Sequence, residues 1–471
     1  MNSFKFWFFI FLLTTLSYSK QNITSSLVTK DLYKTADNTS TKISTEKGGY
    51  TLASIFDKDE INWAKKFDIA ELGSVDDPNK NYEILKKTGA LFIKRDIGYD
   101  WMPAFYYYTN GQNRKFVKWL YKHKESMLLN PEGPFLHCQK EGYDWCRDYY
   151  YDYGNDTLLK ARVDDLIKNI KTKGFKGVFF DWASGGFILS KEYKQTKELF
   201  QKRHPKKNYF NSVKKFYKTL KDRGVFIVTN QAFRKEEYGF LKYIDYDMTE
   251  SYITTDTIKK IHLQLMGKGW VNSIKVTNYY PIYKNSKNIK DSLHFINLLT
   301  SYKEKYKKYG FKNFIYLNYI APDYEKVYAS ATLYRKKKPK NAIYFSYAMG
   351  KLTNNIVYAE LSDERKLERD KVYFYDLGKV LGKNYTKLPK PKDSYIRFYE
   401  KGFVLVSDAK RQKLYLKITS KFIPKNRKIY DAYNNTWLQS KQNSLTVKLE
   451  YQKDIFSNNF LPLGRVFLYN Q

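Results

Sequence analysis

Through most of its length the chain alternates short apolar runs with amphipathic segments of helical spacing. The run Gly177–Phe180 is apolar at every position, which is typical of a strand buried on both faces. The segment before it, Leu158–Lys171, carries apolar residues at helical spacing, and Gly174 follows as a helix stop. Strands that alternate with helices indicate an α/β fold with a parallel sheet, in which functional residues follow the carboxyl ends of the strands.

Eight strand-like runs occur between residues 48 and 388, and helical segments such as Asn208–Arg223 and Asp291–Tyr309 separate them. The runs are Asp68–Gly73, Ala90–Arg95, Pro134–Cys138, Gly177–Asp181, Val225–Asn230, Ile244–Glu250, Asn313–Tyr319 and Ala342–Tyr347. Eight βα repeats predict a (β/α)8 TIM barrel over 48–388.

A different pattern follows this region. Short runs separated by turn residues replace the helical spacing, at Tyr395–Tyr399, Phe403–Ser407, Lys413–Ile418, Lys428–Asp431, Ser444–Leu449 and Arg465–Tyr469. The sequence therefore predicts a small C-terminal antiparallel β domain, similar to a β-sandwich, over 389–471.

The N-terminus has the pattern of a signal peptide. Lys5 precedes the apolar run Phe6–Leu16, and Ser17-Tyr18-Ser19 supplies the small residues that a signal peptidase reads, so we expect cleavage after Ser19. A retained membrane helix is the alternative, but the run is short for a span. We therefore expect a secreted or periplasmic protein, with a polar, flexible lead-in over 20–47 and no stable membrane insertion.

The formal net charge of +36 becomes 36 − 1 = +35 when Lys5 leaves with the signal peptide. Two interpretations stay open: attraction to an acidic polymer or cell surface, and a composition biased towards lysine. No nucleic-acid-binding module is recognisable. The two cysteines, Cys138 and Cys146, are expected to form a disulfide in an exported chain, and His137 alone does not suggest a metal site.

Two acids are the candidate catalytic residues. Asp181 ends one predicted strand and Glu250 ends another, so both belong to the rim of the predicted barrel. Two carboxylates across a rim suit glycoside hydrolysis, one as nucleophile or base and the other as proton donor. Alternatives stay open: Asp181 as a structural or helix-capping residue, Glu250 in a lysine ion pair, and Asp247 as a rival acid. Strand alternation places Asp247 on one face with Asp245 and Thr249.

Further polar and aromatic residues follow the predicted strands, and we expect them to contact substrate. Carboxylates and amides can bind sugar hydroxyls, and aromatic rings can stack on a sugar face; turn formation and core packing are the competing roles. The candidates are Asp100, Trp101, Trp182, Asn230, Tyr252, Asn318 and Tyr319. Motifs for a serine nucleophile elbow, a phosphate loop and a helical zinc site are missing from the sequence, so no cofactor is predicted.

The stretches 177–182 and 249–252 resemble the glycosyl-hydrolase barrels related to the endo-α-1,4-polygalactosaminidase family. Members are similar in having a Gly-[Val/Ile]-Phe-[Leu/Phe]-Asp motif on strand four and a Glu after strand six. The resemblance implies that Asp181 is the nucleophile, that Glu250 is the general acid/base, and that the substrate is a polysaccharide. Tyr375-Asp376-Leu377-Gly378 before a β domain is also similar. The chain departs from the family in its Trp182-Ala183-Ser184-Gly185 continuation.

The sequence thus predicts an exported glycoside hydrolase that cleaves an α-linked polysaccharide, with acidic and amino-sugar polymers as candidate substrates. A retaining mechanism is expected if the two carboxyl groups lie ~5–5.5 Å apart, and an inverting one at ~6.5–9.5 Å. The alternatives are a non-catalytic saccharide-binding envelope protein on a hydrolase-like barrel and an enzyme of another class, such as a deacetylase.

Overall fold

We describe the protein from a computed structural model. It describes residues 122–134, 147–173, 175–181, 194–250, 289–321, 340–361, 371–408, 411–452 and 462–469, four strands before residue 98, and residues 67, 116, 119, 183 and 460. The chain separates into two compact units. The first includes Tyr50–Met248 and Lys305–Lys312, and the second includes Thr249–Glu304 and Asn313–Gln471.

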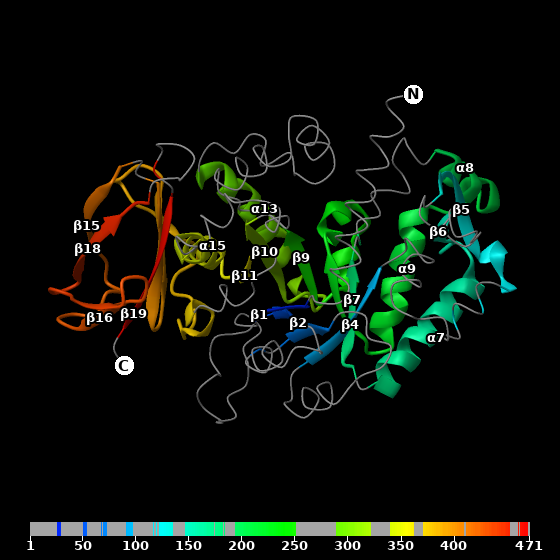
Figure 1. Ribbon diagram of the computed structural model, residues 1–471, viewed down its shortest axis with the longest axis horizontal. Helices are drawn as coiled ribbons and strands as arrows, with labels where there is room; N and C mark the ends of the chain where they lie inside the picture. Colours follow the sequence, from blue (N-terminus) through cyan, green and yellow to red (C-terminus); the bar gives the residue numbers. More distant parts are fainter. Residues whose placement is uncertain are drawn as a thin grey trace, which may run out of the picture. The chain divides into compact units, whose positions relative to one another are not determined.

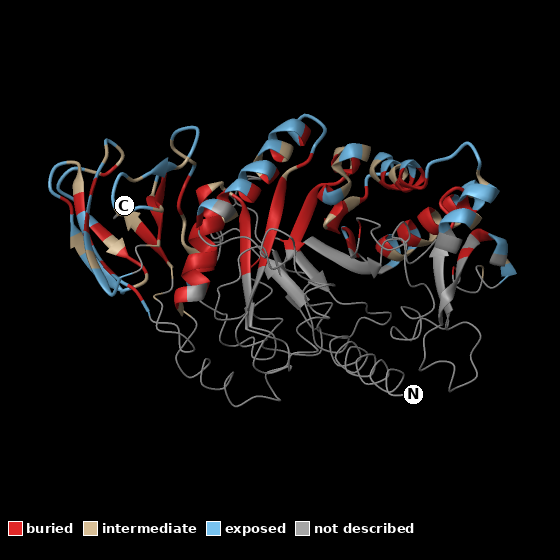
Figure 2. Cartoon of the chain, turned by 90° about the horizontal axis from the view of Figure 1, so that it is seen from above, coloured by how far each residue is buried: buried red, intermediate tan, exposed pale blue. Residues whose placement is uncertain are grey.

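A mostly parallel sheet organises the first unit. Its strands are β1 (Ser26–Thr29), β2 (Tyr50–Ala53), β3 (Ile69–Leu72), β4 (Leu91–Ile97), β7 (Gly177–Asp181), β8 (Phe226–Asn230) and β9 (Tyr246–Glu250), of which the end residues Thr29, Thr249 and Glu250 belong to the second unit. From β2 to β9 each strand pairs in parallel with the next in this list, whereas β1 runs antiparallel to β3. The described core side chains of β7 to β9 are buried, as Figure 2 shows in red. Apolar burial on both faces explains why these strands read as continuous apolar runs.

Gly177 is required by the close approach of two strands. A Cβ at this position would lie 2.1 Å from the carbonyl oxygen of Phe226, its partner on β8. No side chain fits at that distance, so glycine permits the two parallel strands to begin side by side.

Helices α7 (Asp156–Lys173) and α9 (Tyr209–Asp222) lie side by side, with α8 (Lys194–Arg203) and the antiparallel hairpin β5 (Met127–Pro134)–β6 (Arg147–Tyr151) nearby (Figure 1). Asn208 caps α9, because its side-chain oxygen accepts a hydrogen bond from the Asn211 amide at 3.1 Å. Both long helices were predicted from their apolar periodicity, and their bounds agree with the predictions within about three residues.

The second unit contains α13 (Ile289–Lys307, up to Glu304), the parallel pair β10 (Asn313–Ala321) and β11 (Ile356–Leu361), and α15 (Lys340–Leu352) between them in the chain. Helix α15 packs against β10 and β11 and against β14 and β19 of the C-terminal sheet. It is therefore buried along most of its length.

The C-terminal region is antiparallel, as predicted. A six-stranded sheet has the order β12 (Thr386–Lys387), β13 (Ser394–Tyr399), β14 (Gly402–Ser407), β19 (Leu463–Tyr469), β16 (Lys428–Asp431) and β17 (Thr436–Gln439). A second sheet pairs β15 (Lys413–Thr419) with β18 (Ser444–Glu450). One apolar cluster, which includes Phe403, Ile418, Val447 and Phe467, joins both sheets into a two-layer arrangement.

Two of the eight predicted barrel strands are wrong. Ala342–Tyr347 lies inside α15, because a helix buried on most sides carries a continuous apolar run that resembles a buried strand. Pro134 ends β5, which pairs with β6, and β4 pairs directly with β7, so no strand occupies the predicted third position between them; residues 135–138 lie outside the described residues. The parallel strands missed by the prediction are β2 and β11. Strand β1 falls within the segment predicted to be a flexible lead-in.

Candidate active site at the carboxyl ends of β7, β8 and β9

Three adjacent parallel strands end at polar residues. Asp181 is the last residue of β7, Asn230 of β8 and Glu250 of β9. In the register of these strands, Phe180 is opposite Thr229, and Asn230 is opposite Met248. The carboxyl ends of the three strands therefore meet at one edge of the sheet, where parallel α/β folds carry their functional residues.

The two faces of this sheet can be distinguished by their contacts. Phe180 on β7 packs against two aromatic rings of α9, with ring centroids 5.5 Å from Phe216 and 5.6 Å from Tyr217. Phe180 thus lies on the helix-covered face. Its partner Thr229 lies on the same face and hydrogen-bonds Asp247 across to β9.

Strand alternation then assigns the neighbouring positions to the opposite face. Asp181 is two positions after Phe179 on β7, so the two residues share a face of that strand. Glu250 is likewise two positions after Met248 on β9. Asn230 is opposite Met248 in the register and shares their face. Asp181 and Asn230 therefore lie on the face away from α9, and Glu250 follows Met248 by two positions on β9 but belongs to the second unit; the side chains of both acids lie outside the described part of the structure.

Asp247, the rival acid, has a different environment. It is fully buried and accepts three hydrogen bonds: from the Thr229 hydroxyl at 2.7 Å, the Ala232 amide at 3.0 Å and the Phe233 amide at 2.8 Å. Burial raises the pKa of the Asp247 carboxyl to about 7, although its three donors act in the opposite direction. Asp247 therefore connects β9 to the turn after β8, which is a structural role.

The turn after β8 is further held by backbone contacts. Gln231 adopts a left-handed conformation with φ of 68°, and its amide donates to the Met248 carbonyl at 2.9 Å. The Asn230 carbonyl accepts from the Ala183 amide at 3.0 Å, which ties the residues after Asp181 to the end of β8. Asn230 itself is only 2% exposed. The edge of the sheet is thus organised by hydrogen bonds on both sides of Asn230.

The other predicted site residues fall outside this arrangement. Asn318 and Tyr319 lie within β10, which continues to Ala321 instead of ending at Tyr319, and their side chains lie outside the described part. Six more lie outside the described residues altogether: Asp100, Trp101, Trp182, Tyr252, Cys138 and Cys146. The predicted disulfide and the signal peptide (1–19) therefore stay predictions.

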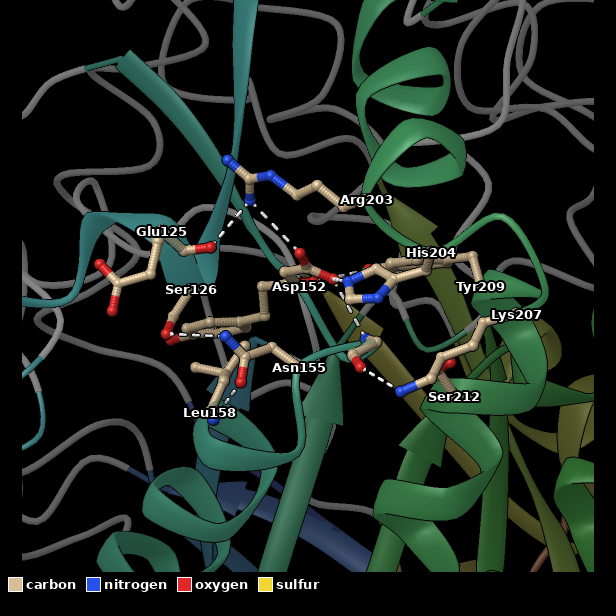
Figure 3. A network of polar contacts seen from close by, with 12 residues as sticks. Glu125, Ser126, Asp152, Asn155, Leu158, Arg203, His204, Lys207, Tyr209 and Ser212 are labelled. Carbon is tan, nitrogen blue, oxygen red and sulfur yellow. Dashed lines mark hydrogen bonds and ion pairs between the residues drawn. The ribbon is translucent and has the colours of Figure 1, made fainter.

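A second polar cluster, which the sequence analysis missed, surrounds Asp152 (Figure 3). Asp152 is 1% exposed and accepts from the His204 ring at 2.8 Å, from Arg203 at 3.3 Å and from the Gly154 amide at 3.1 Å. Gly154 is needed here, because a Cβ would lie 2.4 Å from the His204 ring. The cluster joins the C-terminal end of α8 to the residues that follow β6.

Further contacts extend this cluster to two other elements. Arg203 also donates to the Glu125 carbonyl at 2.9 Å, and Lys207 donates to the Gly154 carbonyl at 2.6 Å. Asn155 donates to Ser126 and caps α7 by accepting from the Thr157 amide. The spacing Asp152-x-Gly154-Asn155 before a helix is a turn and cap signal that could have identified this structural cluster.

Within the described residues, no group of three or more potential ligands is arranged to hold a metal ion. No helix of the described part is both long and apolar enough to cross a membrane.

Comparison with known proteins gave no matching family model and no matching curated protein. Solved structures with some similarity include an α-amylase from Geobacillus thermoleovorans complexed with acarbose, with a TM-score of 0.44, 10% identity, and coverage of 94% of this chain and 96% of that one.

Another is the glycoside hydrolase domain of PelA from Pseudomonas aeruginosa, with a TM-score of 0.36, 11% identity and coverage of 67% and 92%. The noncanonic maltogenic α-amylase AmyB from Thermotoga neapolitana has a TM-score of 0.43, 10% identity and coverage of 83% and 80%. These neighbours are glycoside hydrolases by their descriptions, but similarities of this size carry no argument about fold or function.

Proposed function

We propose that this protein is an exported glycoside hydrolase that cleaves an α-linked polysaccharide with Asp181 and Glu250 on a (β/α)8 barrel. The observation that supports the proposal is that three consecutive strands of a parallel sheet, β7, β8 and β9, end at Asp181, Asn230 and Glu250. The polysaccharide class follows from the resemblance of the strand motifs and from the need of glycoside hydrolysis for two carboxylates.

The role of each acid follows from the retaining scheme. Glu250 protonates the glycosidic oxygen as the bond to the anomeric carbon breaks, and Asp181 attacks that carbon to form a glycosyl ester. Glu250 then removes a proton from water, and the water releases the sugar from Asp181. Asn230 lies on the same face and donates a hydrogen bond to the sugar or to one of the acids. Asp247 takes no part, because its hydrogen bonds and burial belong to the turn after β8.

The aromatic and polar residues near the strand ends are proposed to form the walls of the substrate site. These residues are Asp100, Trp101, Trp182, Tyr252, Asn318 and Tyr319. Carboxylates and amides bind hydroxyl groups, and aromatic rings stack on the apolar face of a pyranose. We further propose that no cofactor is required.

The test compares three conservative variants of the mature protein: Asp181→Asn, Glu250→Gln and Asp222→Asn. Asp222 is the matched control, because it is a half-exposed carboxylate at the end of α9. Release of reducing ends is measured on α-glucans, on α-1,4-linked galactosamine polymers with and without acetyl groups, and on uronic-acid polymers. We expect about 10²–10⁴-fold lower kcat for the first two variants and no change for the third.

Equal turnover in all three variants would exclude the two acids as catalysts. If the wild type cleaves no polymer yet binds one, the alternative of a non-catalytic saccharide-binding protein is favoured. Turnover that is abolished by a chelator and restored by a divalent metal would instead indicate another reaction class, such as deacetylation. The anomeric configuration of the first product, measured by proton NMR, distinguishes retention from inversion.

Export is a separate part of the proposal. We expect the mature protein to begin at Lys20 and to contain a Cys138–Cys146 disulfide. N-terminal sequencing and the mass of the alkylated protein before and after reduction test both expectations. An N-terminus that retains residues 1–19, or two alkylated cysteines before reduction, would contradict them.

A further inference from the structure

An exposed aromatic pair lies on the hairpin formed by β16 and β17. Trp437 on β17 is 54% exposed, although tryptophan is usually well buried. Its ring lies 5.1 Å from the ring of Tyr430 on β16, at an interplanar angle of 50°. Strand β17 is the last strand of the six-stranded sheet, so the pair stands at an open edge.

Tyr430 is held in place, which keeps the pair ordered. Its hydroxyl hydrogen-bonds the side-chain oxygen of Asn435, and its ring meets the ring of Tyr375 at 6.4 Å. An ordered aromatic ring loses little conformational entropy when a ligand stacks on it.

Polar groups flank the pair on the same face. In the register of the hairpin, Tyr430 is opposite Trp437 and Lys428 is opposite Gln439. Residues two apart on a strand share a face, so all four side chains lie on one side of the hairpin. Lys428 and Gln439 are exposed. The face thus presents an indole, a phenol, an amide and an ammonium group to solvent.

The charge around this face is strongly positive. The cations between residues 421 and 443 are Lys421, Lys425, Arg427, Lys428 and Lys441, and the one acid in this stretch is Asp431. Asp431 is 2% exposed and accepts hydrogen bonds from the backbone amides of Tyr433 and Asn434. Where the structure describes side chains, none of the five cations forms an ion pair. Their charge is therefore available to an anionic partner.

The segments that carry most of these cations are fixed to each other. Ser440 donates to the Pro424 carbonyl at 2.7 Å and accepts from the Arg427 amide at 2.9 Å, and Asn443 donates to the Ile423 carbonyl at 2.7 Å. These hydrogen bonds hold the cationic end of the hairpin at a fixed separation from Trp437.

We propose that this face, defined by Lys428, Tyr430, Trp437 and Gln439, binds an acidic polysaccharide. Trp437 stacks on the apolar face of a sugar ring, Gln439 hydrogen-bonds a hydroxyl, and Lys428 pairs with a carboxylate or sulfate of the polymer. The choice of a polysaccharide as the ligand rests on the proposed function, because an exported glycoside hydrolase acts where such polymers are present. Single-stranded nucleic acid fits less well, since its binding sites use a groove with several successive aromatic platforms.

The experiment uses the full mature chain with Glu250→Gln, so that no polymer is cleaved. Dissociation constants are measured by affinity electrophoresis in gels that contain polygalacturonate, alginate or hyaluronan, with amylose as a neutral polymer and oligothymidylate as a nucleic acid. We expect retention by at least one acidic polysaccharide, and Trp437→Ala should weaken it at least five-fold. Trp437→Tyr should restore most of the binding, because it keeps an aromatic ring.

Tyr415→Ala is the matched control. Tyr415 is 62% exposed in the same domain but on β15, and the ammonium of Lys413 lies over its ring at 5.0 Å. This variant should bind as the parent does. Equal binding by the Trp437→Ala and Tyr415→Ala proteins, no retention by any acidic polysaccharide, or tighter binding to oligothymidylate would each overturn the proposal.

The outcome is separable from that of the hydrolase proposal. Loss of binding in Trp437→Ala together with a wild type that cleaves nothing would support the hairpin site and reject the enzyme. Normal turnover of a soluble oligosaccharide with unchanged polymer binding in Trp437→Ala would support the enzyme and reject the hairpin site.

Discussion

Two buried aspartates in the first unit are held by opposite kinds of partner. Asp247, at the carboxyl edge of the sheet, accepts only from neutral donors: one hydroxyl and two backbone amides. Asp152, among the helices, accepts from Arg203, from the His204 ring and from one backbone amide. The difference shows that the sheet edge is fixed by local hydrogen bonds to a turn, whereas the helical layer is fixed by charge between distant segments.

Asp247→Ala should have the largest effect on stability. It leaves the Thr229 hydroxyl and the Ala232 and Phe233 amides buried without an acceptor, and each such group costs roughly 1–3 kcal/mol. We expect a loss of about 3–5 kcal/mol of unfolding free energy in the first unit. Urea denaturation followed by hydrogen exchange of the Ala232 and Phe233 amides measures it. Unchanged protection of these amides would contradict the role assigned to Asp247.

Asp152→Ala should cost less, about 2 kcal/mol. Removing one partner of a fully buried ion pair costs ~3–5 kcal/mol. However, the Arg203 side chain is 30% exposed and that of His204 is 16% exposed, so both can turn towards water. Urea denaturation in low and high salt provides the measurement. The loss should shrink in 1 M salt, which screens charges, whereas the effect of Asp247→Ala should not. Equal salt dependence in both variants would contradict the assignment of charged partners to Asp152 and neutral partners to Asp247.

The stability of the first unit should depend on pH through Asp247. Burial raises the folded-state pKa of this carboxyl from 3.8 to about 7, so the folded protein holds a proton that the unfolded chain has lost between those values. The stabilisation is complete below pH ~4 and is lost as pH rises through 7, with a slope of at most ~1.4 kcal/mol per pH unit.

Asp247→Asn provides the control for this pH dependence. The variant has no proton to lose, so its unfolding free energy should change less between pH 5 and 8 than that of the wild type. Thermal and urea unfolding across this range measure the difference. Parallel curves for the two proteins would show that another group is responsible.

Thr229→Val should have the smallest effect, about 1 kcal/mol. It removes one of three donors to Asp247 while keeping the shape of the side chain, and the two amide donors remain. The matched variant Thr219→Val changes a partly exposed helical threonine whose hydroxyl donates to the Lys215 carbonyl. Urea denaturation should show a larger loss for Thr229→Val. The reverse order would indicate that the contact between Thr229 and Asp247 contributes little.

The strands around the proposed site were predictable because their patterns are local. Gly177–Asp181 was predicted with the observed bounds, and Val225–Asn230 and Ile244–Glu250 began within two residues of the observed strands. Each is a short apolar run between turn residues, which is sufficient to identify a buried strand. The face of Glu250 was left open; in the structure it lies two positions after Met248, which is the last residue of β9 with a register partner on β8.

Other elements could not be predicted because the burial of their apolar residues depends on elements that are distant in the sequence. The run at 342–347 is helical, since α15 is covered by β10 and β11 and also by β14 and β19. Strand β17 was missed because its main aromatic residue, Trp437, is exposed and so breaks the alternation that marks a half-buried strand.

The sequence alone determined that parallel strands end in acids and that an antiparallel domain follows, because apolar periodicity and turn residues act over a few positions. Only the tertiary structure decided which acids are structural. Asp247 and Glu250 are three residues apart on one strand, and the sequence favours Glu250 only by its position at the strand end and by the family resemblance. Packing against α9 marks one face of the sheet, and the hydrogen bonds from Thr229 and from the turn after β8 hold Asp247 on that face in a structural role.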